Sequence, residues 1–243
     1  MIKKFAALFR DQKQYHLFLL MTLSSLFNVA LVAYRLHYIE YDFGHMNSAK
    51  TVYWSRGIPT FLFLIWNLFL AWVPYWIALS LHRLNRHTQS KLLLGGLVFT
   101  WLLFFPNAPY ILTDLLHLRW RTPIPHWYDL MLIVSFAWTG LMLGYLSLFE
   151  IQLFLKQKLS PRASWLLSIS ALLLASYGVY LGRYLRWNSW DIISNPLGLC
   201  QDLFETLSNP MAYASTLGIV LVFFVFMLLG YLTLATLIGN KTN

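Results

Sequence analysis

Long apolar runs separated by short polar stretches dominate the pattern along this chain of 243 residues. Six runs are long enough to cross a bilayer, whose hydrocarbon core of about 30 Å needs about 20 helical residues. They lie at residues 15–34, 61–81, 92–112, 130–150, 164–184 and 216–238. Lipid offers no hydrogen bonds to an open backbone, so each run is expected to be a helix. The pattern therefore predicts an all-α fold, a polytopic transmembrane helix bundle of about six spans.

The polar residues between the runs support these boundaries. Ser160 and Pro161 precede the fifth run, and serine at the N-cap with proline at the first helical position is typical of a helix start. Neither an internal repeat nor a low-complexity linker divides the chain. We therefore expect residues 1–243 to form a single integral membrane domain.

The basic residues are distributed unevenly between the two sides of the predicted bundle. Eleven of the 18 Lys and Arg residues flank the runs on the side of the two termini: Lys3, Lys4, Arg10, Lys13, Arg83, Arg86, Lys91, Lys156, Lys158, Arg162 and Lys241. Because basic flanks favour the cytoplasm, both termini are expected to be cytoplasmic. Seven of the nine Asp and Glu residues fall on the opposite side, where we expect the polar chemistry to lie.

Composition narrows the class of protein further. Hydrophobic residues make up 58% of the chain and charged residues only 11%, whereas a soluble domain has about 25% charged residues. The formal net charge of +9 does not indicate nucleic acid, because the basic residues sit between apolar runs and form no patch with exposed aromatics. The lipid bilayer is the expected partner, and a second membrane protein or a homodimer stays open. Cys200 is the only cysteine, so no intramolecular disulfide can form.

The third run ends in FFPNAPYILTDLLHL, residues 104–118. Residues 92–105 alone would span about 21 Å at 1.5 Å per residue, so the predicted span must include both prolines. Pro106 and Pro109 lack an N–H and disfavour helix in the preceding residue. Asn107 is placed to supply hydrogen bonds to the freed backbone. Two interpretations stay open: a proline kink patched by Asn107, or a discontinuous helix whose loose ends face a ligand, as in many transporters.

Three stretches carry a family resemblance: FFPNAPYILTDLLHL, WYDLMLIVSFAWTGLMLGYLSL and GVYLGRYLRWNSWDI. Together they resemble the bacterial integral membrane family catalogued as domain of unknown function thirteen-sixty-one, over roughly residues 60–235. The resemblance implies a multi-pass protein of the bacterial cytoplasmic (inner) membrane. It carries over no activity, cofactor or catalytic residue.

Polar residues near the outer ends of three spans form a candidate outer-face polar site. Its members are Asn107, Asp114, His117, Asp129, Arg183, Arg186 and Asp191. Asp114 and His117 are spaced i, i+3 and share a helix face, as do the two arginines. Arginine can hold a phosphate or carboxylate in a fork, and Asp and His can exchange protons. The alternative is that two Asp–Arg ion pairs between helices account for most of these charges without a ligand.

The fourth and fifth spans each contain two glycines at GxxxG spacing, which lets backbones approach closely in lipid. We expect the glycine faces to pack against each other in an antiparallel hairpin. Helical geometry then brings Asp129 toward Arg186 at the outer interface.

On the cytoplasmic side, His82 is expected to be solvated and Glu150 to be a boundary charge. No HExxH-type motif or phosphate loop is present, so neither a metal nor a cofactor is expected.

Two function classes remain. The favoured one is a non-enzymatic membrane component that binds or moves a small solute or lipid, or scaffolds other membrane proteins. The alternative is an outward-facing membrane enzyme acting on a lipid-linked or cell-envelope substrate. Its acid–base groups would be Asp114, His117, Asp129 and Asp191, with the two arginines as anion clamps. No charge falls clearly at the midplane of a span, which argues against a proton-coupled pump or an ion channel.

Overall fold

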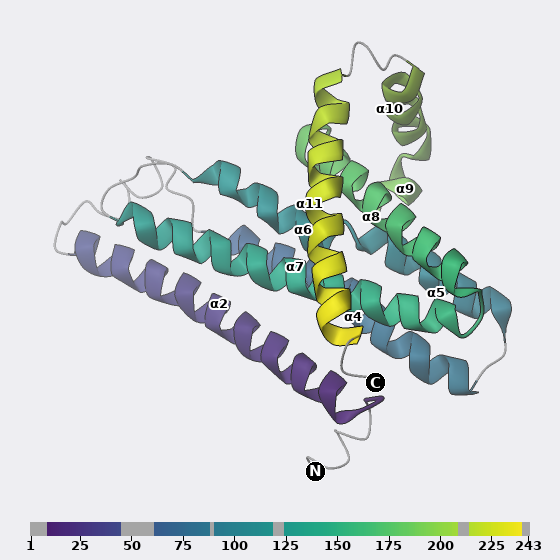
Figure 1. Cartoon of the computed structure of the whole chain (residues 1–243). Helices are drawn as coiled ribbons and strands as arrows, with labels where there is room; N and C mark the ends of the chain where they lie inside the picture. Colours follow the sequence, from purple (N-terminus) through teal and green to yellow (C-terminus); the bar gives the residue numbers. More distant parts are fainter. Residues whose placement is uncertain (1–8, 45–60, 88–89, 119–123, 209–213, 240–243) are drawn as a thin grey trace.

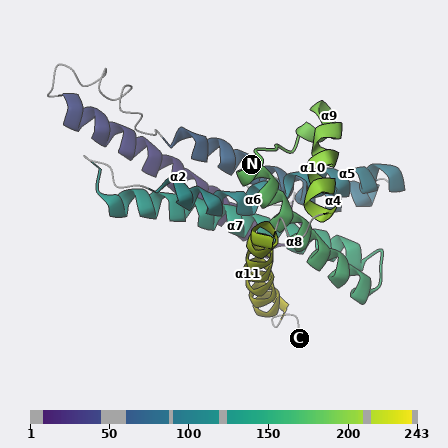
Figure 2. The ribbon, with the colours of Figure 1, turned by 90° about the horizontal axis from the view of Figure 1, so that it is seen from above.

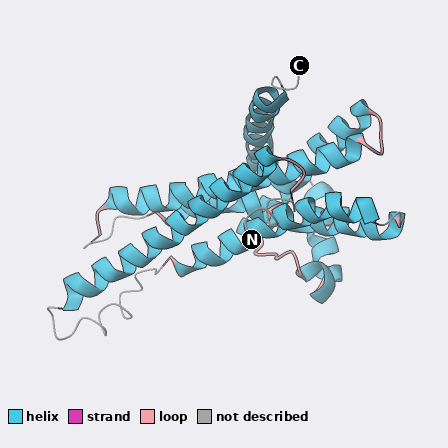
Figure 3. Ribbon diagram, turned by 90° about the horizontal axis from the view of Figure 1, so that it is seen from below, coloured by secondary structure: helices cyan, strands magenta, loops and turns pink. Residues whose placement is uncertain are grey.

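The computed structural model describes residues 9–44, 61–87, 90–118, 124–208 and 214–239. Its long helices are α2 (Gln12–Gly44), α4 (Leu62–His87), α5 (Lys91–Phe104), α7 (His126–Lys156), α8 (Pro161–Tyr184) and α11 (Ala214–Gly239). The shorter elements are α6 (Asn107–Tyr110), the 3-10 helix η1 (Ile111–His117), α9 (Asp191–Ser194) and α10 (Pro196–Ser208). No strand occurs among these residues (Figure 3). The predicted all-α fold is therefore confirmed.

Among the described residues, six helical segments are long and apolar enough to cross a membrane by length and composition. They are Gln12–His37, Leu62–Asn85, Lys91–His117, His126–Lys156, Pro161–Tyr184 and Thr216–Leu237. Each overlaps one of the six predicted runs, so the number and order of the spans are confirmed. The helix start predicted at Ser160 is also present, because its hydroxyl accepts a hydrogen bond from the backbone N–H of Ala163 at 3.3 Å.

Helix α7 lies at the centre of the arrangement. It contacts α2, α4, α6, η1, α8 and α11, and 67% of its most apolar stretch is buried, against 11% for the first span and 17% for the last. Helices α2, α4 and α7 run alongside one another, whereas α11 crosses them (Figure 1) and is seen nearly end-on in Figure 2. The end of the bundle at which α7 begins and α8 ends is called the distal end below, and the opposite end the proximal end.

The proline-containing segment between α5 and η1 follows a kinked but continuous helical path. Phe105, Pro106 and Tyr110 all keep right-handed helical dihedrals. The N–H of Ala108 donates to the carbonyl of Phe105, three residues back, at 3.2 Å. The carbonyl of Phe104 instead accepts the side-chain amide of Asn107 at 2.9 Å. Asn107 therefore patches the backbone as the first of the two sequence interpretations requires.

The glycines of α7 and α8 pack against this segment and not against each other, which corrects the expectation from sequence. A Cβ at Gly140 would lie 2.8 Å from the carbonyl oxygen of Ala108, and one at Gly178 would lie 2.7 Å from Pro106. Gly144 and Gly182 similarly face Ala108 and Tyr110. GxxxG spacing signals close approach but does not name the partner, and here the partner is α6, which contacts both helices.

Candidate functional site

Asp114 is the most enclosed polar group of η1, with 1% of its surface exposed. Its Oδ2 accepts a hydrogen bond from Nδ2 of Asn67, on α4, at 2.9 Å. Its Oδ1 lies 3.5 Å from Nη1 of Arg183, on α8, and 3.7 Å from Nδ1 of His117. Asp114 therefore ties together three separate helical segments, and the predicted grouping of Asp114, His117 and Arg183 is present.

The guanidinium of Arg183 donates hydrogen bonds to several neighbouring acceptors. Its Nη2 donates to the carbonyl of Thr113 and to Nδ1 of His117, the latter at 3.0 Å, and Nη1 lies 3.5 Å from the hydroxyl of Tyr110. A guanidinium can only donate, so the close contact makes Nδ1 of His117 an acceptor, and the ring proton lies on Nε2. The approach of the same nitrogen to Asp114 is longer, at 3.7 Å. Arg183 thus stabilises the cluster and is not presented as an anion clamp.

A second aspartate–arginine pair lies at the distal end, with an unexpected partner. Asp129 pairs with Arg35 of α2, whose Nε and Nη2 reach the two carboxylate oxygens at 2.7 and 3.1 Å. The Arg35 side chain is fully buried, and its guanidinium also lies 4.3 Å from the centre of the Phe61 ring. Arg186, the predicted partner of Asp129, is instead exposed, with a positive φ of 61°. The predicted Asp129–Arg186 pair is therefore wrong.

The Asp191 carboxylate stabilises a local turn by accepting hydrogen bonds from nearby residues. Its Oδ2 accepts from the backbone N–H and the side-chain amide of Asn188, at 2.7 and 3.1 Å, and its Oδ1 accepts from the hydroxyl of Ser194 at 2.9 Å. The hydrogen bond from the backbone N–H of Asn188, followed by that from Ser194, lowers the pKa of the Asp191 carboxyl below its ordinary value of 3.8. Asp191 thus holds the loop that follows α8 and does not join the Asp114 cluster.

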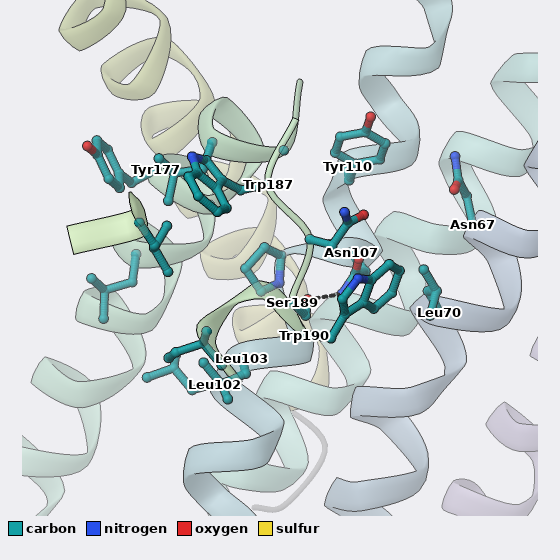
Figure 4. Close-up of a pocket in the computed structure, with 18 of the residues that line it drawn as sticks. Asn67, Leu70, Leu102, Leu103, Asn107, Tyr110, Tyr177, Trp187, Ser189 and Trp190 are labelled. Atoms are coloured by element: carbon teal, nitrogen blue, oxygen red, sulfur yellow. Dashed lines mark hydrogen bonds between the residues drawn. The ribbon is translucent and has the colours of Figure 1, made fainter. Parts of the chain in front are cut away.

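A cavity of about 380 Å³ lies beside the Asp114 cluster. Residues of α4, α5, α6, α8, α9, α10 and the loop 187–190 line it. In Figure 4, Tyr177 and Trp187 lie on one side of this cavity and Tyr110 and Asn67 on the other. Asn107 and Ser189 lie between them, joined by a hydrogen bond of 2.9 Å. The cavity is thus mostly apolar and aromatic, with a few amide and hydroxyl groups among its walls.

The orientation of two asparagine side chains in this lining is fixed by their partners. Nδ2 of Asn67 faces the Asp114 carboxylate, and Nδ2 of Asn107 faces a backbone carbonyl, so both amide nitrogens must point to these acceptors. The Oδ1 atoms of Asn67 and Asn107 accept no hydrogen bond from the described residues. Neither oxygen is fully enclosed by those residues. Because both residues line the cavity, these two oxygens are candidate acceptors for a molecule held there.

A third polar cluster, at the proximal end, was not predicted. Glu150 is buried, and its Oε2 lies 3.0 Å from Nη1 of Arg10 and 3.1 Å from Nε2 of His82. The same His82 nitrogen lies 3.0 Å from the backbone carbonyl of Glu150. The expectation that His82 is solvated and Glu150 a simple boundary charge is therefore wrong. Together these contacts join the N-terminal segment to α4 and α7.

Two residues important to the site, Asn67 and Arg35, were missed in the sequence. Each interrupts or closes an apolar run, and a polar group within a membrane span is costly unless it has a partner. That signal marks both residues as needing a partner, although it does not name one. Among the described residues, no group of three or more His, Cys, Asp or Glu side chains is placed to hold a metal ion.

The fold and the site define a class: a multi-pass, all-helical membrane protein with a polar cluster and an apolar cavity at one end of its bundle. The profile of the family described as "Protein of unknown function (DUF1361)" matches residues 66–230, and the chain belongs to this family. The resemblance noted in the sequence is thereby confirmed. No curated protein and no solved structure matches the chain significantly.

Proposed function

We propose that this protein is a non-enzymatic component of the bacterial cytoplasmic membrane that binds a lipid-type amphiphile in the cavity at its distal end.

The proposal includes an orientation in the membrane. Both termini lie in the cytoplasm, so the cavity belongs to the outer leaflet. Basic flanks on the side of the termini support this orientation. Reporter fusions at residues 122 and 158 test it, with an external signal expected at the first and a cytoplasmic signal at the second.

The observation that carries this proposal is the construction of the cavity. Its volume of about 380 Å³ falls within the range of small-molecule sites, about 300–1,000 Å³, which are typically apolar with a few placed polar groups. Its walls include Trp66 and Leu174, which lie on membrane-spanning helices and are 55% and 53% exposed. An acyl chain in the bilayer can therefore reach the cavity sideways, while a head group meets the amides of Asn67 and Asn107.

The enzyme alternative has less support, because its acid–base groups are not gathered in one place. Asp129 is enclosed with Arg35, and Asp191 holds its own turn. Only Asp114 and His117 come together, and both are engaged with Arg183. These contacts favour a structural role over a catalytic one: the residues hold the helices in place around the cavity.

Two neighbouring leucines on α8 allow a matched test. Leu174 lines the cavity and Leu173 does not, although their exposed fractions are similar, 53% and 46%. We expect Leu174→Trp, which fills part of the cavity, to reduce the lipid retained after mild detergent extraction, measured by native mass spectrometry. Leu173→Trp should retain as much lipid as the unaltered protein. Equal retention by all three proteins would show that the cavity does not hold the lipid.

A further inference from the structure

We infer that the head group bound in this cavity is uncharged and bears hydroxyl groups. The inference rests on the proposed function, because it names the class of amphiphile that the same cavity accepts. It predicts a neutral lipid such as a diacylglycerol or a glycosylated diacylglycerol, and it disfavours phospholipids with a net charge.

The first argument is the charge of the walls. None of the residues that line the cavity is Asp, Glu, Lys, Arg or His. The charged groups that hydrogen-bond to lining residues lie behind the walls: Asp114 and Arg183 face each other across 3.5 Å, Asp191 accepts from Asn188, and Asp202 accepts from the indole of Trp187. A phosphate in the cavity would lose its water without gaining a cationic partner, and the nearby Asp191 and Asp202 carboxylates would oppose it, which is strongly unfavourable.

The second argument is the hydrogen-bonding character of the polar wall atoms. The Oδ1 atoms of Asn67 and Asn107 are acceptors, and the hydroxyl of Tyr177 is enclosed without a hydrogen-bond partner among the described residues, so a ligand group that can both donate and accept fits this lining. The indole N–H of Trp187 is not available as a competing donor, since it already binds the carboxylate of Asp202 at 2.8 Å. Among uncharged lipid head groups, hydroxyls are groups of this kind. The rings of Tyr110 and Trp190 add apolar surface beside them.

Position supports the same class of ligand. Most polar wall atoms belong to α4, α6 and the loop 187–190, with the hydroxyl of Tyr177 added from α8, whereas leucines of α5 and α8 supply much of the remaining wall. An amphiphile with hydroxyls at one end and acyl chains at the other matches this division. A free sugar or polyol shares the hydroxyl chemistry but would leave the leucine-lined part of the cavity without a partner.

The test is competitive photolabelling in phosphatidylcholine nanodiscs. Each sample carries one trace probe with the same photoactivatable acyl chains: a diacylglycerol, a monoglucosyl-diacylglycerol or a phosphatidic acid. We expect each neutral probe to label the protein at least about tenfold more than phosphatidic acid, the ratio that a difference of about 1.4 kcal/mol in binding produces. Free glucose in excess should leave the labelling unchanged, because the acyl chains are part of the recognised molecule.

A charge placed in the wall provides a second readout that does not depend on removing a contact. Leu203 and Phe204 are neighbours on α10, and only Leu203 lines the cavity. Leu203→Arg should shift the labelling ratio toward phosphatidic acid, because it supplies the missing counter-charge. Phe204→Arg, at a position 72% exposed, should leave the ratio unchanged.

The outcomes separate the inference from the proposed function. If labelling is reduced by Leu174→Trp but phosphatidic acid labels as well as the neutral probes, the cavity binds lipid and the inference about the head group is wrong. Suppression by free glucose would also overturn it, in favour of a soluble sugar. If Leu174→Trp leaves the labelling by every probe unaltered, the proposed function itself fails.

Discussion

Two aspartate–arginine pairs lie at the distal end. They differ in the distance between the two charged groups and in the exposed fraction of the arginine side chain. Arg35 and Asp129 meet at 2.7 Å with 0% and 5% of their side chains exposed. Arg183 and Asp114 approach only to 3.5 Å, and Arg183 keeps 13% of its side chain exposed. The first pair, called the sealed pair below, is enclosed by protein. The second, called the open pair, lies beside the cavity.

The difference shows that the same two residue types serve separate purposes in one bundle. The sealed pair holds α2 against α7, and a buried Asn28 on α2 strengthens the same interface by donating to Thr139 of α7 at 2.8 Å. Asp114, in contrast, divides its hydrogen bonds between Asn67 and Arg183, so it holds α4 and α8 around the proline-containing segment. The open pair therefore sets the spacing of the helices that frame the cavity.

The largest expected effect comes from breaking the sealed pair. Arg35→Met leaves the buried Asp129 carboxylate without a counter-charge, and we expect the free energy of unfolding in mixed micelles to fall by about 3–5 kcal/mol. Arg183→Met should cost less, about 1–3 kcal/mol, because Asp114 keeps its bond to Asn67. Denaturant titration measures both changes. Equal losses would show that the two pairs do not differ as described.

The controls for this prediction distinguish pairing from general damage. Arg35→Met with Asp129→Leu removes both charges and should recover most of the lost stability. A charge swap, Arg35→Asp with Asp129→Arg, should partly restore folding, whereas Asp129→Arg with Arg186→Asp should not. Rescue by the second swap would place Arg186 beside Asp129 and contradict the structure.

Within the open pair's surroundings, Asp114 and His117 differ in how deeply they are buried. Asp114 is 1% exposed, whereas the His117 side chain is 45% exposed. Asp114→Asn removes the charge that faces Arg183, and we expect a loss of about 1–3 kcal/mol in unfolding free energy. His117→Gln should cost less, since most of its contacts are replaceable by water. A larger loss for His117→Gln than for Asp114→Asn would contradict this ranking.

Close packing of the proline-containing segment gives a further prediction. A methyl group at Gly140 would meet the backbone of Ala108 at 2.8 Å, whereas one at Gly95 would meet nothing within 4 Å. We expect Gly140→Ala to destabilise the protein by about 1–3 kcal/mol through overpacking. Gly95→Ala should be neutral or stabilising, because alanine favours helix by about 1 kcal/mol. Lipid retention should also fall in Gly140→Ala, since the segment it displaces lines the cavity.

The smallest expected effect concerns pH and the loop that covers one side of the cavity. The pKa of Asp191 is lowered in the folded protein by its bond from the Asn188 N–H, so its ionised form stabilises the turn. This stabilisation is present above the ordinary pKa of 3.8 and is lost as the pH falls through the lowered value. Hydrogen exchange of peptide 187–195 should therefore show less protection at acidic pH, compared at each pH with Asp191→Asn. Protection that changes with pH equally in both proteins would exclude Asp191 as the cause.

Much of the fold was predictable because span length and backbone satisfaction in lipid leave few choices. The kink at Pro106 with its repair by Asn107 was one of the two interpretations that the sequence left open, because the prolines show only that backbone carbonyls are freed there. The partner of Asp129 was not, because Arg35 lies 94 residues away in the chain and a helical wheel gives only a direction. The glycine spacing likewise predicted close contact without indicating α6. The cavity depends on how the loop after α8 comes to lie against α6, through Ser189 and Asn107, which no local pattern encodes.

In the proposed function, the cavity beside the open pair holds a lipid-type amphiphile. The most direct measurement is the position of the covalent label left by a photoactivatable diacylglycerol in nanodiscs, located by peptide mass spectrometry. We predict label concentrated in peptides spanning 102–110, 174–182 and 187–203, and lost from them in Leu174→Trp. Label spread evenly over the lipid-facing surfaces of α2 and α11, with no enrichment in those peptides, would contradict the claim.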